Sequence, residues 1–118
     1  MASTPEERAA KRLAYLEKVT AEGSTDPMAW YGLALEYGKG DRFDEALQTY
    51  TTLRTFNSEY VPMYLMCGQM LGKCERWSEA RDWLEAGVAV ATKKGEAHAL
   101  GELRTALDGV LFELGDEA

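Results

Sequence analysis

The one histidine of this 118-residue sequence, His98, is the side chain best suited to acid–base or metal chemistry near neutral pH. A catalytic dyad would also need a nucleophile, and no serine or cysteine lies at a spacing that suggests a partner. We therefore expect His98 to be a surface or capping residue near the start of the last helix.

Two other features resemble reactive sites only superficially. The adjacent acids Asp44 and Glu45 point in different directions on a helix, so we expect them to stabilise a helix N-terminus and not to form an acid–base pair. The stretch Gly-Lys-Gly-Asp at 38–41 lacks the preceding strand and the Gly-Lys-Ser/Thr ending of a phosphate-binding loop. The sequence therefore predicts a protein that is not an enzyme and uses no cofactor.

The two cysteines, Cys67 and Cys74, are seven residues apart. On one helix their Cα atoms would lie ~10 Å apart, which is too far for a disulfide. Because no histidines accompany them at ligand spacing, they give no zinc pattern either. We expect a buried thiol at Cys67, a loop thiol at Cys74 and a reduced, cytoplasmic setting. The sequence contains no apolar run of the ~18 residues that a membrane span needs and no recognisable secretory signal.

The acidic side chains are concentrated near the end of the sequence. The formal net charge is −7, and residues 95–118 carry six acids against one base, Arg104. An acidic chain without a basic stripe is a poor candidate for binding nucleic acid or an anionic membrane. A solvated outer face accounts for this charge most simply, and a docking patch for a basic partner is the alternative.

Six helices are expected from the apolar periodicity and from the residues that begin or end helices. Thr4 and Pro5 open the first helix, and Gly23 ends it near residue 22. Asp26 opens the second helix in the same way, and Asp41 is the expected N-cap of the third.

The second half continues this pattern. We expect a fourth helix over about 60–71, a fifth from Arg76 to about Thr92, and a last helix after Gly95. No alternating apolar and polar run predicts a strand. Short connections make neighbouring helices pack antiparallel, so the expected fold is all-α and built of helix hairpins. The apolar stripe of the last helix comprises Leu100, Leu103, Leu107, Val110, Leu111 and Leu114.

The segments 37–46 and 71–80 are similar to each other and lie 34 residues apart. Self-similarity at such a period indicates stacked helical units that each bury an apolar face against a neighbour. The residue pairs at this spacing are Trp30 and Tyr64, Tyr37 and Leu71, Phe43 and Trp77, Ala46 and Ala80, Tyr50 and Leu84, and Leu53 and Gly87.

This pattern resembles the tetratricopeptide repeat, whose unit is Trp-x2-Leu-Gly-x2-Tyr followed by Ala-x3-Phe. The first unit matches it with Trp30, Leu33, Ala34, Tyr37, Ala46 and Tyr50. The second matches it with Tyr64, Cys67, Gly68, Leu71, Ala80 and Leu84. Ala34, Gly68, Ala46 and Ala80 would be small because the two helices of each unit meet there. The chain is also similar to small, stand-alone bacterial proteins of this family.

The resemblance implies a single domain over 1–118, folded as a right-handed α-solenoid of antiparallel helix hairpins. Repeat 1 would span 27–60 and repeat 2 would span 61–94. An N-terminal half-repeat helix (5–22) and a C-terminal capping helix (95–114) would flank these two full units.

In this family the second face of each first helix lines a concave groove that binds a peptide or a partner helix. The matching residues here are Met28, Tyr31, Leu35, Lys39, Leu65, Met66, Gln69 and Lys73. An apolar, methionine-containing face suits an apolar partner. The resemblance therefore implies a protein–protein interaction module for a partner protein or peptide, as a monomer or a weak homodimer.

Alternatives to this interpretation remain open. The apolar stripe could instead be core covered by a terminal helix, or the interface of a homodimer. Lys39 and Lys73 could contact an acidic residue of a partner, or could simply be favoured at helix ends. The family members that clamp a terminal carboxylate can be set aside, because Tyr31, Leu35 and Met66 occupy the clamp positions and cannot donate to that group.

Overall fold

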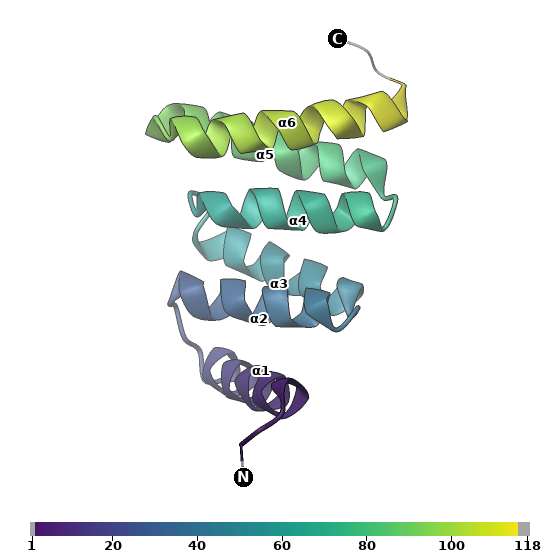
Figure 1. The fold of residues 1–118 in the computed structure, drawn as a ribbon. Coiled ribbons are helices and arrows are strands. Elements are labelled where there is room, and N and C mark those ends of the chain that lie inside the picture. Colours follow the sequence, from purple (N-terminus) through teal and green to yellow (C-terminus); the bar gives the residue numbers. More distant parts are fainter. Residues whose placement is uncertain (1, 116–118) are drawn as a thin grey trace. The chain divides into compact units, whose positions relative to one another are not determined.

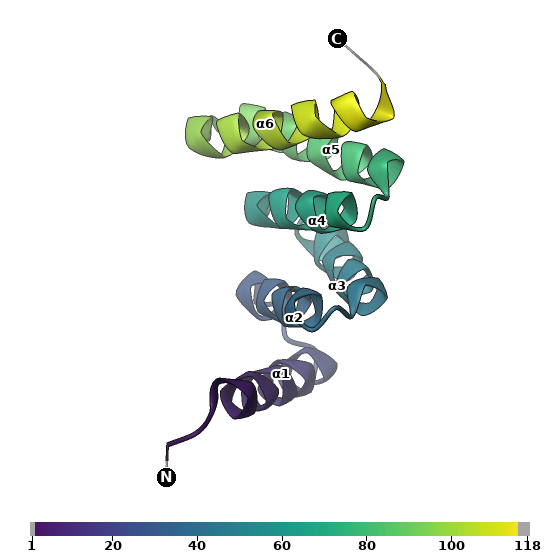
Figure 2. The same cartoon turned by 45° about the vertical axis from the view of Figure 1, so that its right-hand side comes forward.

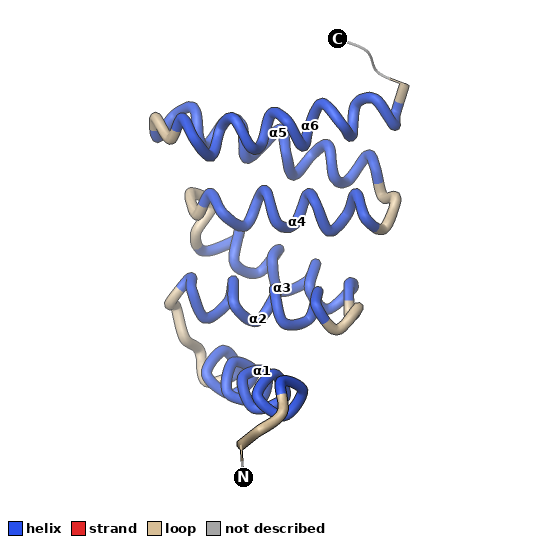
Figure 3. The backbone as a smooth tube through the Cα atoms, viewed as in Figure 1, coloured by secondary structure: helices blue, strands red, loops and turns tan. Residues whose placement is uncertain are grey.

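The computed structural model describes residues 2–115 and contains six α-helices (Figure 1). Their bounds are α1 Pro5–Ala21, α2 Pro27–Lys39, α3 Phe43–Phe56, α4 Val61–Lys73, α5 Trp77–Lys94 and α6 Ala97–Leu114. Between these helices the described chain has only loops and turns and no strand (Figure 3). The predicted all-α class is thus confirmed. In residues 2–115, no helix combines the length and hydropathy needed to cross a membrane.

Local capping explains where the first two helices begin. The backbone N–H of Glu7 donates to Thr4 Oγ1 at 3.1 Å, and that of Met28 donates to Asp26 Oδ1 at 3.0 Å. Each cap therefore satisfies an amide that has no partner within its helix. Both of these predicted helix starts are confirmed.

The predicted cap of the third helix is wrong. Arg42, not Asp41, occupies the N-cap position of α3, and Asp41 has a left-handed backbone with φ of 60°. Asp41 instead ends α2, because its N–H donates to Gly38 O at 3.1 Å and the next N–H, of Arg42, donates to Tyr37 O at 2.9 Å. These two bonds form a Schellman motif, which closes a helix with one left-handed residue.

Helix α5 ends two residues later than predicted, because it continues past Thr92 to Lys94. Gly95 then adopts φ of 70°, and its N–H donates to Thr92 O at 3.1 Å. Glycine has no Cβ to oppose this left-handed conformation, so it ends the helix as expected.

The chain divides into two compact units, one up to Asn57 and one from Ser58 onward. In the first unit α2 and α3 form an antiparallel hairpin, and α1 packs on α2 (Figure 1). Its core includes Ala34 and Ala46, which are fully buried, so the small residues expected at the helix crossing lie in the core.

In the second unit α4, α5 and α6 all contact one another (Figure 2). Two buried glycines bring these helices close together. A Cβ at Gly68 would lie 2.5 Å from Leu84 Cγ, and a Cβ at Gly87 would lie 2.6 Å from Tyr64 Cβ and 2.8 Å from Leu103 Cδ2. Such distances are too short for a real side chain, so α4 and α6 approach α5 at positions that require glycine. The repeat boundaries at 27–60 and 61–94 stay predictions.

Candidate functional site

The eight residues predicted to form a binding groove lie on α2 and α4, four on each helix. On α2 they are Met28, Tyr31, Leu35 and Lys39. Met28 is 68% exposed, Tyr31 and Leu35 are half-buried, and Lys39 is exposed. By contrast, Leu33, Ala34 and Tyr37 on the same helix are buried. Trp30, which the sequence places on the same face as these three residues, is only half-buried, so the predicted contrast between the two faces of α2 holds in part.

On α4 the predicted residues are Leu65, Met66, Gln69 and Lys73. Leu65 and Met66 are half-buried, whereas Gln69 and Lys73 are exposed. The neighbouring Met63 is fully buried at 0% exposure and belongs to the core. This part of the methionine-containing stripe is thus divided between core and surface.

The predicted groove lysine on α2 contacts an acid of its own helix. Lys39 Nζ lies 3.6 Å from Glu36 Oε1, and Arg12 Nε of α1 lies 2.7 Å from the same oxygen. The Glu36 side chain is only 8% exposed, and its ion pair with Arg12 joins α1 to α2. The ion pair with Glu36 gives Lys39 a partner within its own helix, and its contact with an acidic residue of a partner protein stays a prediction.

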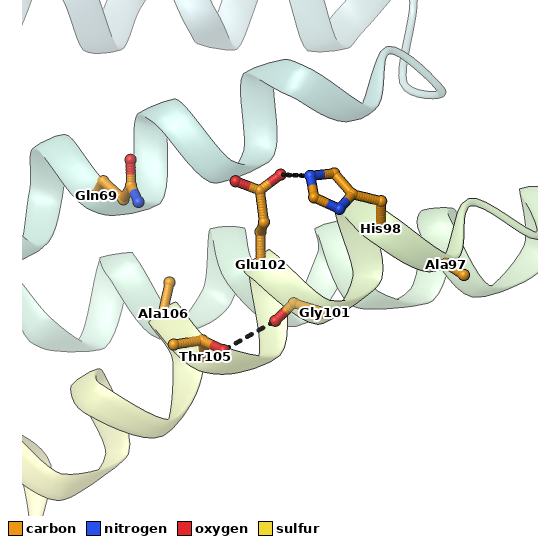
Figure 4. A pocket seen from close by; sticks show the side chains of 7 residues that line it. All are labelled: Gln69, Ala97, His98, Gly101, Glu102, Thr105 and Ala106. Atoms are coloured by element: carbon orange, nitrogen blue, oxygen red, sulfur yellow. Dashed lines mark hydrogen bonds and ion pairs between the residues drawn. The ribbon is translucent and has the colours of Figure 1, made fainter.

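A pocket of about 600 Å³ lies in the second unit, where α6 faces α4 (Figure 4). One of its lining residues, Gln69 on α4, belongs to the predicted groove. The others lie on α6, which the sequence predicts as a capping helix with an acidic outer face: Ala97, His98, Gly101, Glu102, Thr105 and Ala106.

The polar groups of this pocket are carried mainly by one face of α6. The Glu102 side chain extends toward α4, and its Oε1 lies 3.3 Å from His98 Nε2 (Figure 4). His98 is 93% exposed, so the prediction of a surface histidine near the start of this helix is confirmed. Thr105 Oγ1 donates to Gly101 O at 3.0 Å and is thereby used within the helix. The Glu102 carboxylate is therefore the main charged group of the pocket.

The α6 residues of the pocket could have been found from the sequence. Leu100 and Gly101 follow Cys67 and Gly68 by 33 residues, which aligns the start of α6 with the start of α4. With the same shift, Leu65 corresponds to His98, Gln69 to Glu102 and Lys73 to Ala106. The pocket therefore joins the predicted face of α4 to the equivalent face of α6.

The first unit contains a smaller pocket of about 200 Å³, lined by Trp30, Tyr37, Glu45, Gln48, Thr49 and Thr52. The phenol of Tyr37 interacts with two residues of the protein. Tyr37 Oη donates to Glu17 Oε2 at 2.7 Å, and the guanidinium carbon of Arg42 lies 4.6 Å from the ring centre. Burial, together with the hydrogen bond to Glu17, raises the pKa of Tyr37 to about 12. A hydroxyl that holds its proton this firmly is poorly suited to act as a base or a nucleophile.

The remaining candidates for chemistry are the two cysteines. Cys67 is buried and Cys74 lies in the turn after α4, as predicted. Among the residues that the structure describes, no group of three or more His, Cys, Asp or Glu side chains could hold a metal ion.

Several solved structures have similar folds. The solution structure of a tetratricopeptide repeat domain protein from Salinibacter ruber has a TM-score of 0.72 at 28% identity, covering 79% of this chain and 94% of that one. A crystal structure of such a protein from the same organism gives a TM-score of 0.66 at 30% identity, covering 72% of this chain and 96% of that one.

A third similar structure is that of a protein from Bordetella parapertussis. It has a TM-score of 0.73 at 25% identity, covering 86% of this chain and 88% of that one. No family model matches the sequence, and no curated protein matches it.

Proposed function

Because the chain belongs to the tetratricopeptide repeat family, we propose that it is a protein–protein interaction module that binds a peptide or a helix of a partner protein on the second faces of its first helices. The predicted family and its all-α fold class are confirmed by the similar structures. The proposed binding residues are Met28, Tyr31, Leu35 and Lys39 on α2 and Leu65, Met66, Gln69 and Lys73 on α4.

The observation that carries this proposal is the pocket between α4 and α6. The repeat position of Gln69 predicts it as a groove residue. It lines this pocket together with residues at the equivalent positions of α6. A face that remains open to solvent at this point is able to admit a ligand. Partly exposed apolar side chains on the second faces of α2 and α4, such as Tyr31 and Leu65, would supply most of the affinity.

The experiment that tests this proposal is affinity capture of partners from a cell lysate, with folded variants compared side by side. Tyr31→Ala removes a proposed anchor, and Tyr15→Ala is the matched control because Tyr15 is a 64% exposed tyrosine on α1. We expect one or more proteins to be recovered by the wild type and by Tyr15→Ala and lost with Tyr31→Ala. Equal recovery by all three would place the binding site on another surface.

Stability measurements on the same variants test whether Tyr31 is exposed enough to act as an anchor. If Tyr31 is mainly a binding residue, Tyr31→Ala should change the free energy of unfolding only slightly. A loss of ~3–5 kcal/mol, which is typical of truncating a buried aromatic residue, would assign Tyr31 to the core instead.

The second candidate function is self-association through the same face. It is favoured by Met28, a large apolar side chain that is 68% exposed on that face. Sedimentation velocity over a range of protein concentrations separates the two functions. A mass that rises with concentration in the wild type, but not in Met28→Glu, would support a homodimer.

The proposal further holds that the protein is not an enzyme, uses no cofactor and acts in the cytoplasm as a monomer or a weak homodimer. The formal net charge of −7 supports a protein partner in preference to a nucleic acid or an anionic membrane surface.

A further inference from the structure

We infer that the pocket between α4 and α6 accepts a lysine or arginine side chain of the partner, with the Glu102 carboxylate as its counter-ion. This inference rests on the proposed function, because it assigns a chemical class to one residue of the segment that binds there. The partner would therefore be a peptide segment with a basic residue, not only an apolar one.

The geometry of the pocket suits a long cationic side chain. Glu102 extends from α6 toward α4, and its side chain is 52% exposed, so its carboxylate can be reached from solvent (Figure 4). Ala97, Gly101 and Ala106 supply small apolar surfaces, against which the methylene groups of a lysine or arginine can pack. Gln69 brings an amide from the opposite helix, and its carbonyl oxygen can accept a further hydrogen bond.

The charges around the pocket favour a cation. Its described lining includes the Glu102 carboxylate and neither a lysine nor an arginine. Elsewhere on α6, Asp108 and Glu113 outnumber Arg104. Such an excess of one sign attracts a ligand of the opposite sign and discriminates against acidic segments.

Neither Lys94 nor Lys73 is among the residues that line the pocket. Lys94 Nζ, at the end of α5, lies 3.8 Å from Glu96 Oε1. Lys73 lies at the C-terminal end of α4, one turn beyond Gln69, and its repeat equivalent on α6 is the uncharged Ala106. The Glu102 carboxylate lies 3.3 Å from His98 Nε2. A guanidinium could bind the carboxylate through two parallel hydrogen bonds, which a single imidazole nitrogen cannot do.

The equivalent positions in the repeats show where the preference for a cation is located. Leu35 on α2 corresponds to Gln69 on α4 and to Glu102 on α6, so the same position is apolar, then polar, then acidic. A single glutamate thus gives the α6 face a charge preference that the α2 face lacks.

Selection of peptides from a phage-displayed library of random 12-residue sequences tests this inference on the whole protein. We expect the enriched peptides to share a lysine or an arginine. Binding of a synthetic version of the best peptide would then be measured by fluorescence anisotropy. Loss of one charge-assisted hydrogen-bonded pair in Glu102→Gln should weaken binding by about 10- to 100-fold.

Asp108→Asn is the matched control, because it removes the same charge from α6 at a residue that does not line the pocket. We expect it to leave the affinity nearly unchanged. A charge exchange completes the test: Glu102→Lys should abolish binding of the original peptide and restore binding when the basic residue of the peptide is replaced by glutamate.

Three results would overturn the inference, and they differ in what they say about the proposed function. Equal weakening by Glu102→Gln and Asp108→Asn would show attraction to the overall charge of the protein and not a site. Enriched peptides without a basic residue, whose binding is lost in Tyr31→Ala, would overturn the role of Glu102 and leave the proposed function standing. Failure to enrich any peptide would count against both.

Discussion

The hairpins α2–α3 and α4–α5 have the same connecting turn but different interiors. Asp41 and Glu75 both have left-handed backbones, with φ of 60° and 58°. The N–H of Arg42 donates to Tyr37 O at 2.9 Å, and the equivalent N–H of Arg76 donates to Leu71 O at 2.9 Å. Each arginine also pairs with the glutamate three residues later, at 2.6 Å in the first hairpin and 2.8 Å in the second. The repeat therefore extends to the hydrogen bonds of the turn.

A hydrogen bond at the start of each hairpin is also repeated. Trp30 Nε1 donates to Ser24 O at 2.7 Å, and Tyr64 Oη donates to Ser58 O at 2.5 Å. In both cases the first aromatic residue of the repeat binds a carbonyl six residues before it. This hydrogen bond joins the helix to the loop that precedes it.

The interiors differ where a third helix packs. Leu53 in the first hairpin corresponds to Gly87 in the second. The Leu53 side chain is fully buried in the core of the first unit. At the equivalent position of the second unit, Gly87 has no side chain, and Tyr64 and Leu103 occupy that space. The comparison teaches that the backbone hydrogen bonds define the hairpin, while side-chain volume decides how closely the next helix approaches.

The largest expected effect comes from the first aromatic residue of each hairpin. Tyr64 is 1% exposed and packs against Trp83, with ring centres 5.8 Å apart. Tyr64→Ala should lower the free energy of unfolding by ~3–5 kcal/mol. Trp30 is only half-buried, so Trp30→Ala should lower it by less. Urea denaturation of both variants measures the difference, and equal losses would contradict the proposed contrast between the interiors.

A smaller effect is expected at Gly87. A Cβ there would lie 2.6 Å from Tyr64 Cβ, which cannot move aside without shifting its helix. Gly87→Ala should therefore destabilise the protein by ~1–3 kcal/mol, despite the better helix propensity of alanine. The control is Gly109→Ala on α6, where a Cβ would meet nothing within 4 Å. This variant should be more stable by ~0.5–1 kcal/mol. A thermal melt that shifted both variants in the same direction would refute the close approach at Gly87.

Tyr37→Phe should lower the free energy of unfolding by ~1 kcal/mol at neutral pH, because it removes one hydrogen bond to Glu17. The pKa of Tyr37 is raised from 10.0 to about 12 in the folded protein by burial and by Glu17, so the folded state holds this proton more tightly. The stability that this group contributes is complete below pH 10 and is lost as the pH rises toward about 12.

The difference between Tyr37→Phe and the wild type should therefore shrink over that alkaline range. Chemical denaturation at a series of pH values measures this change. Tyr15→Phe is the control, since it removes the hydroxyl of a tyrosine that is 64% exposed on α1. A constant difference between Tyr37→Phe and the wild type would contradict the raised pKa.

The smallest effect is expected in the repeated turns. A left-handed backbone costs a residue with a Cβ roughly 1–2 kcal/mol, and glycine avoids this cost but loses more chain entropy on folding. Glu75→Gly should therefore stabilise the protein by ~0.5–1 kcal/mol. Asp41→Gly should stabilise the protein less, because aspartate tolerates this conformation better than glutamate does. Melting temperatures that fell in both variants would show that these side chains stabilise the turns.

Most of the helices could be predicted from the sequence because their signals are local. Thr4 and Asp26 are caps that act within three residues, and Gly95 ends α5 by its own conformation. Asp41 was misassigned because aspartate is common both at N-caps and in left-handed turns, and its type alone does not distinguish the two.

The candidate site was only partly predictable. The exposure of Met28 and of Gln69 agrees with their repeat positions. Glu102 and His98 are not among the predicted site residues, because the sequence favours a capping role for α6 and gives its acidic charge as a docking patch only as an alternative. The groove made jointly by α2 and α4 stays a prediction, because its form depends on distant packing that repeat positions do not specify.

The glycine at position 87 has a consequence for how binding could evolve. It lies on α5 and does not line the pocket, yet it contacts residues of both α4 and α6, the two helices that do. A larger residue there would push these helices apart and change the width of the pocket without altering any group that touches a ligand. Under the proposed function, ligand preference could therefore be adjusted from a buried position, and variants with the same lining residues would differ in what they bind.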